Sequence, residues 1–321
     1  MKKLGIVVIG LIIIGCYSCG SERNNDKKEN DLREYELVGN VKYELIGNVK
    51  KVTIEEYEAD RFGKIIKKGI SNITYSVSFN KDGRKIVIEE YLIPCVKFFK
   101  YDDKNNLIEK YVKSEETSKD VLIDRRKYDD KNNCIESIIY NINGDIAGKW
   151  IFKYDEKDRL IEESWYSEES LFLESGSLSH KWIYKYDGKG NKIEDNLYNS
   201  DGYLCDKHIY KYDEKGNNTE YFWYDSDGKL LEKTIYKYDK KGNNTESYSY
   251  DSEGILYVKE QSKYNNKNLK TVYKYYVKGY EVIEFIHQYE YQYDKKGNWI
   301  KMIVYENKVP KTITYRTIEY Y

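Results

Sequence analysis

Histidine is the side chain that most often acts as a general acid or base near neutral pH, and this chain of 321 residues has only three. They are His180, His208 and His287. His208 falls at a position of a sequence repeat where other units carry Trp150, Trp182 or Thr234, so we expect it to pack rather than to catalyse or bind metal. No local departure from the repeat is centred on a serine, as a Ser-His-Asp arrangement would require. The sequence therefore predicts no catalytic residue.

Two turn sequences superficially suggest calcium: 199–202, which reads Asn-Ser-Asp-Gly, and 225–228, which reads Asp-Ser-Asp-Gly. A calcium loop needs about six or more oxygens, including a distant bidentate carboxylate. Here the next residue is Tyr203 or Lys229, and a strand-like stretch follows at once, so we interpret both as turns. Cys16 and Cys19 have redox spacing but lie at a predicted cleavage site. We expect no metal and no cofactor.

The first residues predict export. Lys2 and Lys3 precede an apolar run at 4–14, which is much shorter than the roughly 20 residues that span a bilayer. The run ends Ile-Ile-Gly-Cys at 13–16, which resembles a bacterial lipobox. The resemblance implies that Cys16 receives a diacylglyceryl group and becomes the mature N-terminus. An ordinary signal peptide that leaves Cys16 a free thiol is the alternative, and Cys19 is a weaker acceptor.

This interpretation divides the chain into three parts: a signal peptide at 1–15, a lipid-anchored polar linker at 16–33 and a repeat domain at 34–321. The linker from Gly20 onward is polar apart from Leu32 and should be solvated. The chain has 54 basic and 55 acidic residues, so charge gives no reason to expect nucleic acid. Cys95, Cys134 and Cys205 fall at different places in the repeat, which leaves open whether they form disulfides.

Each unit of the repeat begins with a tyrosine, and the best-kept intervals are 26 residues. The eight leading tyrosines are Tyr101, Tyr128, Tyr154, Tyr186, Tyr212, Tyr238, Tyr264 and Tyr293. The fourth residue after each of them is Gly, Asn or Asp, the types most at ease with positive φ. The predicted turn residues in the clearest units are Asp213, Gly216, Asp225, Gly228, Asp239, Gly242, Asp294 and Gly297. Each Asp and Gly stand first and fourth in their turn, as in a type I turn closed by a bulge.

Between the turns the apolar residues alternate with period two, which predicts strands. We therefore expect an all-β fold: a repetitive antiparallel β-hairpin meander of 26-residue units that forms a twisted, curled, elongated sheet. If Tyr212 pairs with Asn217 and Tyr224 with Lys229, Tyr210, Tyr221 and Trp223 share a core face on the concave side.

The other face should carry a ladder of oppositely charged pairs. On this register the directly opposed pairs are Glu136 with Lys149, Glu194 with Lys207, Glu220 with Lys233, and Glu246 with Lys259. The units at the start of the repeat domain are degenerate, with Gly-Asn-Val-Lys duplicated at 39–42 and 47–50. The last segment, 309–321, contains Pro310 and no Asp-Gly turn. We expect both ends to act as caps, which the edges of an open sheet would need, and the sequence leaves open whether the sheet closes.

The longest break in the period lies between Tyr154 and Tyr186, where 167–178 extends one turn. Insertions in repeat arrays usually emerge as loops on one face. The inserted stretch contains the apolar residues Leu171, Phe172 and Leu173, which makes them the candidate binding residues. A tolerated long hairpin is the alternative.

The Tyr-Asp-x-x-Gly-Asn units resemble the YD (Rhs-type) repeats of bacterial surface and secreted proteins, over roughly residues 79–305. The Leu-x-Gly-Asn-Val-Lys sequences resemble small repeat lipoproteins common in Bacteroidetes-like bacteria. The resemblance implies a β-hairpin architecture and no particular activity. In large Rhs toxins such repeats form a shell around a C-terminal toxin, for which we expect no room in this chain.

We therefore expect a non-catalytic envelope lipoprotein, bound to the membrane through Cys16, that acts as a binding or scaffolding surface for a protein or glycan. The face of the membrane is left open. The alternatives are a polysaccharide-acting enzyme and a toxin-related or immunity-like repeat protein. An exposed carboxylate pair in an aromatic cleft, about 5 to 10 Å apart, would favour the enzyme. A continuous hairpin sheet without such a cleft would favour binding.

Overall fold

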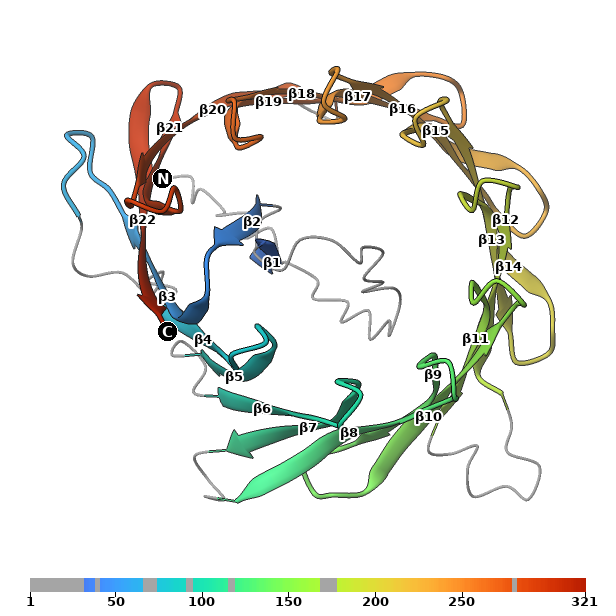
Figure 1. Cartoon of the computed structure of the whole chain (residues 1–321). Helices are drawn as coiled ribbons and strands as arrows, with labels where there is room; N and C mark the ends of the chain where they lie inside the picture. Colours follow the sequence, from blue (N-terminus) through green and yellow to red (C-terminus); the bar gives the residue numbers. More distant parts are fainter. Residues whose placement is uncertain are drawn as a thin grey trace, which may run out of the picture.

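The computed structural model describes residues 32–37, 41–65, 74–90, 95–114, 119–167, 178–278 and 282–321. The expected lipid acceptor Cys16 and the inserted residues Leu171, Phe172 and Leu173 lie outside these ranges. The described part is all-β, and 20 antiparallel strands form a closed barrel of hairpins (Figure 1).

The barrel strands follow the chain from β3 to β22, and each pairs with the next. Their bounds are β3 Val49–Glu58, β4 Thr74–Phe79, β5 Lys85–Glu90, β6 Cys95–Tyr101, β7 Leu107–Ser114, β8 Asp120–Tyr128, β9 Cys134–Tyr140, β10 Ile146–Tyr154, β11 Leu160–Ser167, β12 His180–Tyr186, β13 Lys192–Asn199, β14 Leu204–Tyr212, β15 Asn218–Tyr224, β16 Leu230–Tyr238, β17 Asn244–Asp251, β18 Leu256–Tyr264, β19 Lys270–Lys278, β20 Val282–Tyr293, β21 Trp299–Glu306 and β22 Val309–Tyr320.

The last strand closes the barrel. β22 pairs antiparallel with β3, from Thr312 opposite Glu58 to Tyr320 opposite Val49. The sheet is therefore closed, and the expectation that the two ends cap open edges is wrong. The segment that we expected to cap an edge is instead the partner of the first barrel strand. Closure removes the unpaired N–H and C=O groups that an edge would expose.

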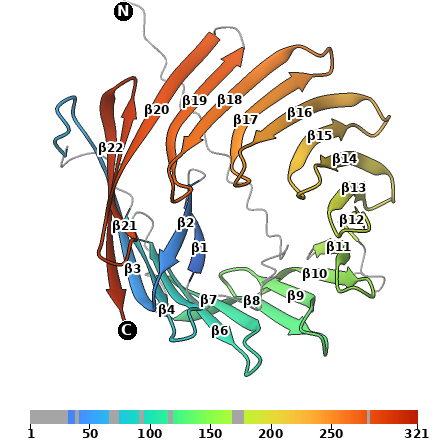
Figure 2. The same cartoon turned by 45° about the horizontal axis from the view of Figure 1, so that its top comes forward.

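A two-stranded sheet of β1 (Leu32–Leu37) and β2 (Val41–Ile46) stands apart from the barrel ladder. Figures 1 and 2 both place it inside the ring. Leu45 of β2 is buried in one apolar cluster with Val52 and Ile54 of β3 and Val77 of β4. The side chains of Val52, Ile54 and Val77 therefore mark the face of the barrel that points inward.

The alternation of strand residues carries this inner face around the ring, because directly paired residues of neighbouring strands share a face. On β14 and β15 the inner face carries His208 opposite Trp223 and Tyr210 opposite Tyr221. The aromatic columns are thus on the concave side, as the sequence predicts.

The register differs from the predicted one by two residues. Tyr212 pairs with Asn218 across a bulge, and Lys211 then lies directly opposite Glu220. Glu220 faces Ile235 on the next strand, while Lys233 lies opposite Phe222. The expected direct opposition of Glu220 and Lys233 is therefore wrong, although the two side chains share a face and come within 3.7 Å diagonally.

The same correction applies to the other predicted pairs: Glu136 faces Ile151 rather than Lys149, Glu194 faces Ile209 rather than Lys207, and Glu246 faces Gln261 rather than Lys259. The physical reason is the turn. Asp213 N–H bonds the carbonyl of Asn217, so the hairpin closes one residue later than expected, and the bulge adds one more. A shift of two keeps every side chain on its predicted face.

The outer wall carries the charged ladder in this corrected register. In six units the Lys that precedes the leading tyrosine lies across from a Glu nine positions later, in the pairs Lys100–Glu109, Lys127–Glu136, Lys153–Glu162, Lys185–Glu194, Lys211–Glu220 and Lys237–Glu246. The Nζ to carboxylate distances run from 2.6 to 3.2 Å. These exposed lysines limit each pair to about 0–1 kcal/mol, so the ladder favours this register more than it adds stability.

Candidate binding site on the inner wall

A row of six aromatic rings crosses the inner wall from β10 to β15. The row consists of Trp150, Trp165, His180, Trp182, His208 and Trp223. Ring centroids are 5.0 Å apart for Trp150 and Trp165, 5.6 Å for Trp150 and His180, 5.7 Å for Trp182 and His208, and 6.0 Å for His208 and Trp223. All six side chains are half-buried, so each keeps some exposed surface.

A glycine leaves room for one of these rings. Gly148 precedes Trp150 by two residues on the same inner face of β10, and the Trp165 ring lies over it. A Cβ at residue 148 would collide with the Trp165 ring and with the carbonyl of Tyr166. Gly148 therefore creates the space in which the Trp165 ring lies flat against the wall.

Carboxylates and phenols lie beside the row. Asp195 on β13 accepts a hydrogen bond of 2.9 Å from the Tyr210 hydroxyl and forms an ion pair of 2.6 Å with Lys192, and His208 Nδ1 lies 3.7 Å away. The Tyr221 hydroxyl is 3.0 Å from the same His208 nitrogen. At the end of the row, Trp223 Nε1 donates to Asp206 at 2.8 Å.

Glu163 is a deeply placed acid of this region. It lies opposite Trp182 and is 5% exposed, and the Tyr184 hydroxyl donates to its Oε1. Its Oε2 is buried and has no hydrogen-bond partner within the described residues. Burial raises the pKa of Glu163 above its usual value, against the lowering effect of the Tyr184 hydrogen bond. Burial, with the charges of Glu163 and Asp195, also raises the pKa of Tyr184.

Glu163 and Asp195 are both deeply buried acids of the inner wall. Glu163 is 5% exposed and Asp195 is 3% exposed, and each is held by a tyrosine hydroxyl. The described strands form a continuous antiparallel ladder in this region.

The predicted turn residues form two rims, one at each end of the hairpins. Turns that follow a leading tyrosine form the first rim, and in each the next residue, an aspartate or in one turn Asn265, bonds its own loop. Asp213 Oδ1 accepts from the N–H groups of Lys215 and Asn217, and Gly216 has a φ of 85°. The same contacts and positive φ recur at Asp239 with Gly242, at 84°, and at Asp294 with Gly297, at 91°.

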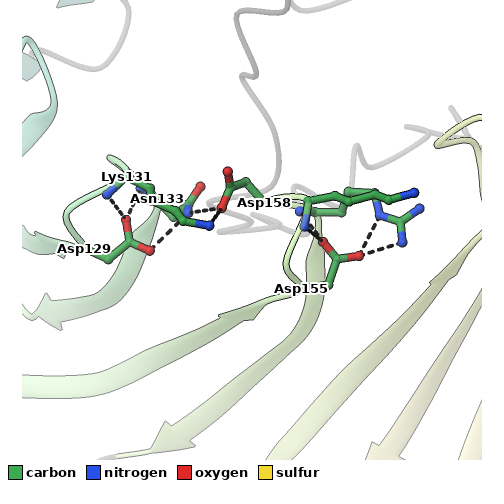
Figure 3. Close-up of polar contacts among 7 residues, drawn as sticks. Asp129, Lys131, Asn133, Asp155 and Asp158 are labelled. Atoms are coloured by element: carbon green, nitrogen blue, oxygen red, sulfur yellow. Dashed lines mark hydrogen bonds and ion pairs between the residues drawn. The ribbon is translucent and has the colours of Figure 1, made fainter.

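Neighbouring turns on this rim contact each other (Figure 3). Asp129 accepts from the backbone of Lys131 and from both nitrogens of Asn133. Lys131 and Asn133 in turn donate to Asp158 of the following turn, at 2.9 and 3.3 Å. The aspartates of this rim are thus committed to turn geometry, which explains why each unit repeats them.

Open grooves lie between successive turns of this rim. One is lined by Asp187, Asn191, Tyr210, Tyr212 and Asp213, and an equivalent one by Asp102, Asn106, Arg126, Tyr128 and Asp129. The same groove recurs because the same residues recur, and its polar groups bond each other.

The second set of turns forms the other rim. Asp225 bonds the N–H groups of Asp227 and Lys229, and Gly228 has a φ of 78°. Asn199 bonds Asp201 and Tyr203 in the same way, so the two calcium-like sequences are used as turns. No group of three or more His, Cys, Asp or Glu in the described ranges is arranged to hold a metal ion.

The aromatic row lies near this second rim. Trp165 pairs with His180, and the insertion with Leu171, Phe172 and Leu173, itself outside the described residues, connects the two strands. Of the cysteines whose side chains are described, Cys134 is buried and Cys205 is half-buried, and both are free thiols. The described part of the chain contains no helix with the length and apolar character needed to cross a bilayer.

The sequence shows residues of the row at equivalent repeat positions. In an open sheet, however, that pattern indicates side chains that pack against each other. Trp150, Trp182 and His208 occupy equivalent positions of the repeat, and Trp165 and Trp223 belong to the predicted core face. In a closed barrel, side chains at these positions face an interior space. About eight strands already give a barrel interior that side chains can fill, so 20 strands enclose more space than the inward side chains occupy.

No family model matches the sequence, and no curated protein matches it. Among solved structures, a crystal structure titled TcdB2-TccC3 without hypervariable C-terminal region matches with TM-score 0.34 and 12% identity over 82% of this chain. This chain spans only 17% of that one. A porin-like protein from Bacteroides uniformis matches with TM-score 0.35 and 10% identity, covering 84% of this chain and 98% of that chain. A Photorhabdus luminescens Tc holotoxin pore structure matches with TM-score 0.32 and 10% identity, over 79% of this chain and 16% of that chain.

Proposed function

We propose that this chain is a non-catalytic, Rhs-type repeat lipoprotein of the bacterial cell envelope whose inner wall is a binding or scaffolding surface for a protein or glycan. The observation that carries the proposal is the partly exposed row of four tryptophans and two histidines facing the interior of a closed barrel. A contiguous set of partly exposed large aromatic rings, unlike a single exposed ring, is typical of a binding site.

The outer wall supports a tethered rather than an embedded barrel. A membrane-embedded barrel presents an apolar band about 25 Å tall to lipid. The outer wall here presents the ladder of lysines and glutamates, and the side chains of Lys127, Lys153 and Lys211 are 63%, 59% and 58% exposed. In the proposal the barrel therefore lies in water next to the membrane and is held there by acyl groups on Cys16.

Anchoring is tested by Cys16→Ser in the native host. We expect the variant to leave the membrane fraction or to accumulate as unprocessed precursor, because the acyl acceptor is lost. Mass spectrometry of the N-terminal peptide and detergent partitioning measure the two outcomes, with Cys19→Ser as the matched control. Unchanged mass and partitioning of Cys16→Ser would reject the lipoprotein assignment.

Binding is tested by capture from envelope extract with the soluble domain starting near Asp31. The expected partner should be lost when Trp182 and Trp223 are both replaced by alanine, and kept when the outer-wall residue Phe222 is replaced. Replacing 167–177 by an Asp-Ser-Asp-Gly turn asks whether the insertion contributes. We expect the melting temperature to stay nearly unchanged and capture to weaken. Capture that survives all these changes would place recognition elsewhere.

A further inference from the structure

We propose that the aromatic row binds an uncharged oligosaccharide, with pyranose rings stacked on the tryptophans and sugar hydroxyls donating to the neighbouring acids. This inference rests on the proposed function, because it names the ligand class for the inner wall. It is carried by the ring geometry, by the acceptors beside the rings and by the absence of a sheet edge in the described barrel.

The row offers aromatic surface on five of the six strands from β10 to β15. Trp150 and Trp165 come from adjacent strands with centroids 5.0 Å apart, and Trp182, His208 and Trp223 continue the row across β12 to β15. Neighbouring strands are about 4.8 Å apart, so the row crosses the strands rather than following one of them. A chain molecule lying along it would meet rings on β10, β11, β12, β14 and β15 and Leu197 on β13. Trp150 and Trp165 are tilted by 43°, and Trp182 and His208 meet edge to face at 84°.

The polar groups beside the rings are mainly acceptors. Asp206 holds the Trp223 indole N–H at 2.8 Å and is half-buried, so part of it still faces the interior. Glu232 lies opposite Trp223 on β16, accepts from Thr234 and Tyr257, and is also half-buried. A carboxylate can accept about four hydrogen bonds, so both retain capacity for ligand hydroxyl donors.

These acids disfavour the other ligands that stack on aromatic rings. Single-stranded nucleic acid uses aromatic platforms together with a positively charged groove, whereas here Asp206 and Glu232 flank the row and Lys192 beside it is paired with Asp195. A peptide that binds by adding a strand to the wall needs an exposed edge, and β22 pairs with β3 so that the described ring of strands has none. An uncharged sugar chain needs neither cations nor an edge.

The test is a titration of the full chain in detergent, followed by tryptophan fluorescence. The chain has five tryptophans; four lie in the row, and Trp299, packed near Tyr291, is 2% exposed. Fluorescence therefore reports mainly on the row. The probes are maltoheptaose, cellohexaose and chitohexaose, with deca-proline as the peptide arm and polyuridylate as the nucleic-acid arm. We expect a saturable change with at least one oligosaccharide and none with the other two.

Four variants locate the site. Trp182→Ala and Trp223→Ala should each weaken oligosaccharide binding about tenfold or more, which corresponds to about 1.4 kcal/mol. Trp223→Phe should recover part of the loss. Phe222→Ala removes a neighbouring ring from the outer face of the same strand and should leave binding unchanged.

A fifth variant changes the row without deleting a ring. Gly148→Ala should weaken binding by displacing the Trp165 ring from its place on the wall. Circular dichroism and melting temperatures confirm that each variant is folded.

The outcomes separate the two proposals. Binding of deca-proline or polyuridylate alone, lost in Trp223→Ala, overturns the sugar assignment and leaves the inner wall as the binding surface. Equal losses in Phe222→Ala and Trp182→Ala overturn the row as the sugar site. If no probe binds and envelope capture is also indifferent to the tryptophans, both proposals fail.

Discussion

The leading tyrosine of a repeat unit is explained by one hydrogen bond. The Tyr212 hydroxyl donates to the carbonyl of Lys192 at 2.7 Å, and Tyr238 and Tyr264 donate in the same way to Asn218 and Asn244, at 2.7 and 2.8 Å. Each bond crosses to the preceding hairpin, at the first or second residue after its turn. Phenylalanine would fill the same space without this bond, which favours tyrosine over phenylalanine in a chain with 37 of one and 8 of the other.

We expect Tyr212→Phe to lower the free energy of unfolding by about 1 kcal/mol, because it leaves the Lys192 carbonyl without this donor. Tyr203→Phe is the matched control, since Tyr203 is 71% exposed. Urea denaturation followed by circular dichroism measures both. If the free energy of unfolding falls no more in Tyr212→Phe than in Tyr203→Phe, the Tyr212 hydroxyl does not stabilise the contact between neighbouring hairpins.

The outer ladder predicts acid sensitivity. Hydrogen bonds from Lys237, Tyr248 and Gln261 lower the pKa of Glu246 to about 2. A depressed pKa in the folded state means stability that is present above the ordinary value of 4.5 and is lost as pH falls toward 2. Glu246→Gln should therefore flatten the fall in melting temperature between pH 4.5 and 2. An unchanged slope would contradict the assignment.

At the level of the elements, the sequence predicts on which face of a strand each side chain lies. It does not predict which residue of the neighbouring strand lies opposite. The Asp and Gly spacing identifies both turns of each hairpin, and Asn105, Asn132, Asp158 and Asn268 adopt the positive φ that their position implies. Composition does not reveal which two residues form the first hydrogen bond across a turn. Nor does it reveal by how many residues a bulge shifts the pairing with the neighbouring strand. The predicted charged pairs are therefore wrong by two residues, while the inner and outer walls are predicted correctly.

Cysteine cross-linking distinguishes the two registers. Phe222 and Lys233 are directly paired, so Phe222→Cys with Lys233→Cys should form a disulfide on mild oxidation. Glu220→Cys with Lys233→Cys should not, because diagonal neighbours are about 7–8 Å apart and a disulfide needs Cβ atoms about 3.5–4.5 Å apart. Both pairs are made in a background with Cys134 and Cys205 replaced by serine, and peptide mass spectrometry reads the result. Cross-linking of the second pair alone would restore the register predicted from the sequence.

At the level of the whole molecule, closure could not be predicted from the repeat. Every unit specifies only its own turns and its contacts with the next unit, and nothing in one unit states whether the last strand meets the first. The contacts that join them are particular to the ends: Thr314 Oγ1 donates to Glu56, and the Tyr321 hydroxyl donates to the carbonyl of Phe79. The candidate site could not be predicted for the same reason. An aromatic ring on the concave face packs against other side chains in a curled sheet, but it is partly exposed to the interior in a wide barrel.

Removal of β22 tests the role of closure. Truncation after Lys308 should leave β3 and β21 as two unpaired edges, which invite pairing between molecules. We expect concentration-dependent association measured by sedimentation, with strand content by circular dichroism largely kept. Replacing Lys311 alone, an exposed residue of β22, is the control and should leave the sedimentation unchanged. A truncated chain that stays as dispersed as the control would show that closure is not needed to protect the edges.

The direct pairing of β22 with β3 also fixes how such a protein can change in size. Around a ring in which every neighbour is antiparallel, strand directions alternate, so only an even count returns to its start. The chain can thus gain or lose hairpins but not single strands. Each hairpin alters the circumference by about 10 Å, two strand spacings of about 4.8 Å. Duplication of a 26-residue unit, Tyr212 to Lys237 for example, would insert one hairpin and widen the ring in one discrete step. The diameter of a barrel of this architecture therefore changes only in steps of one whole repeat.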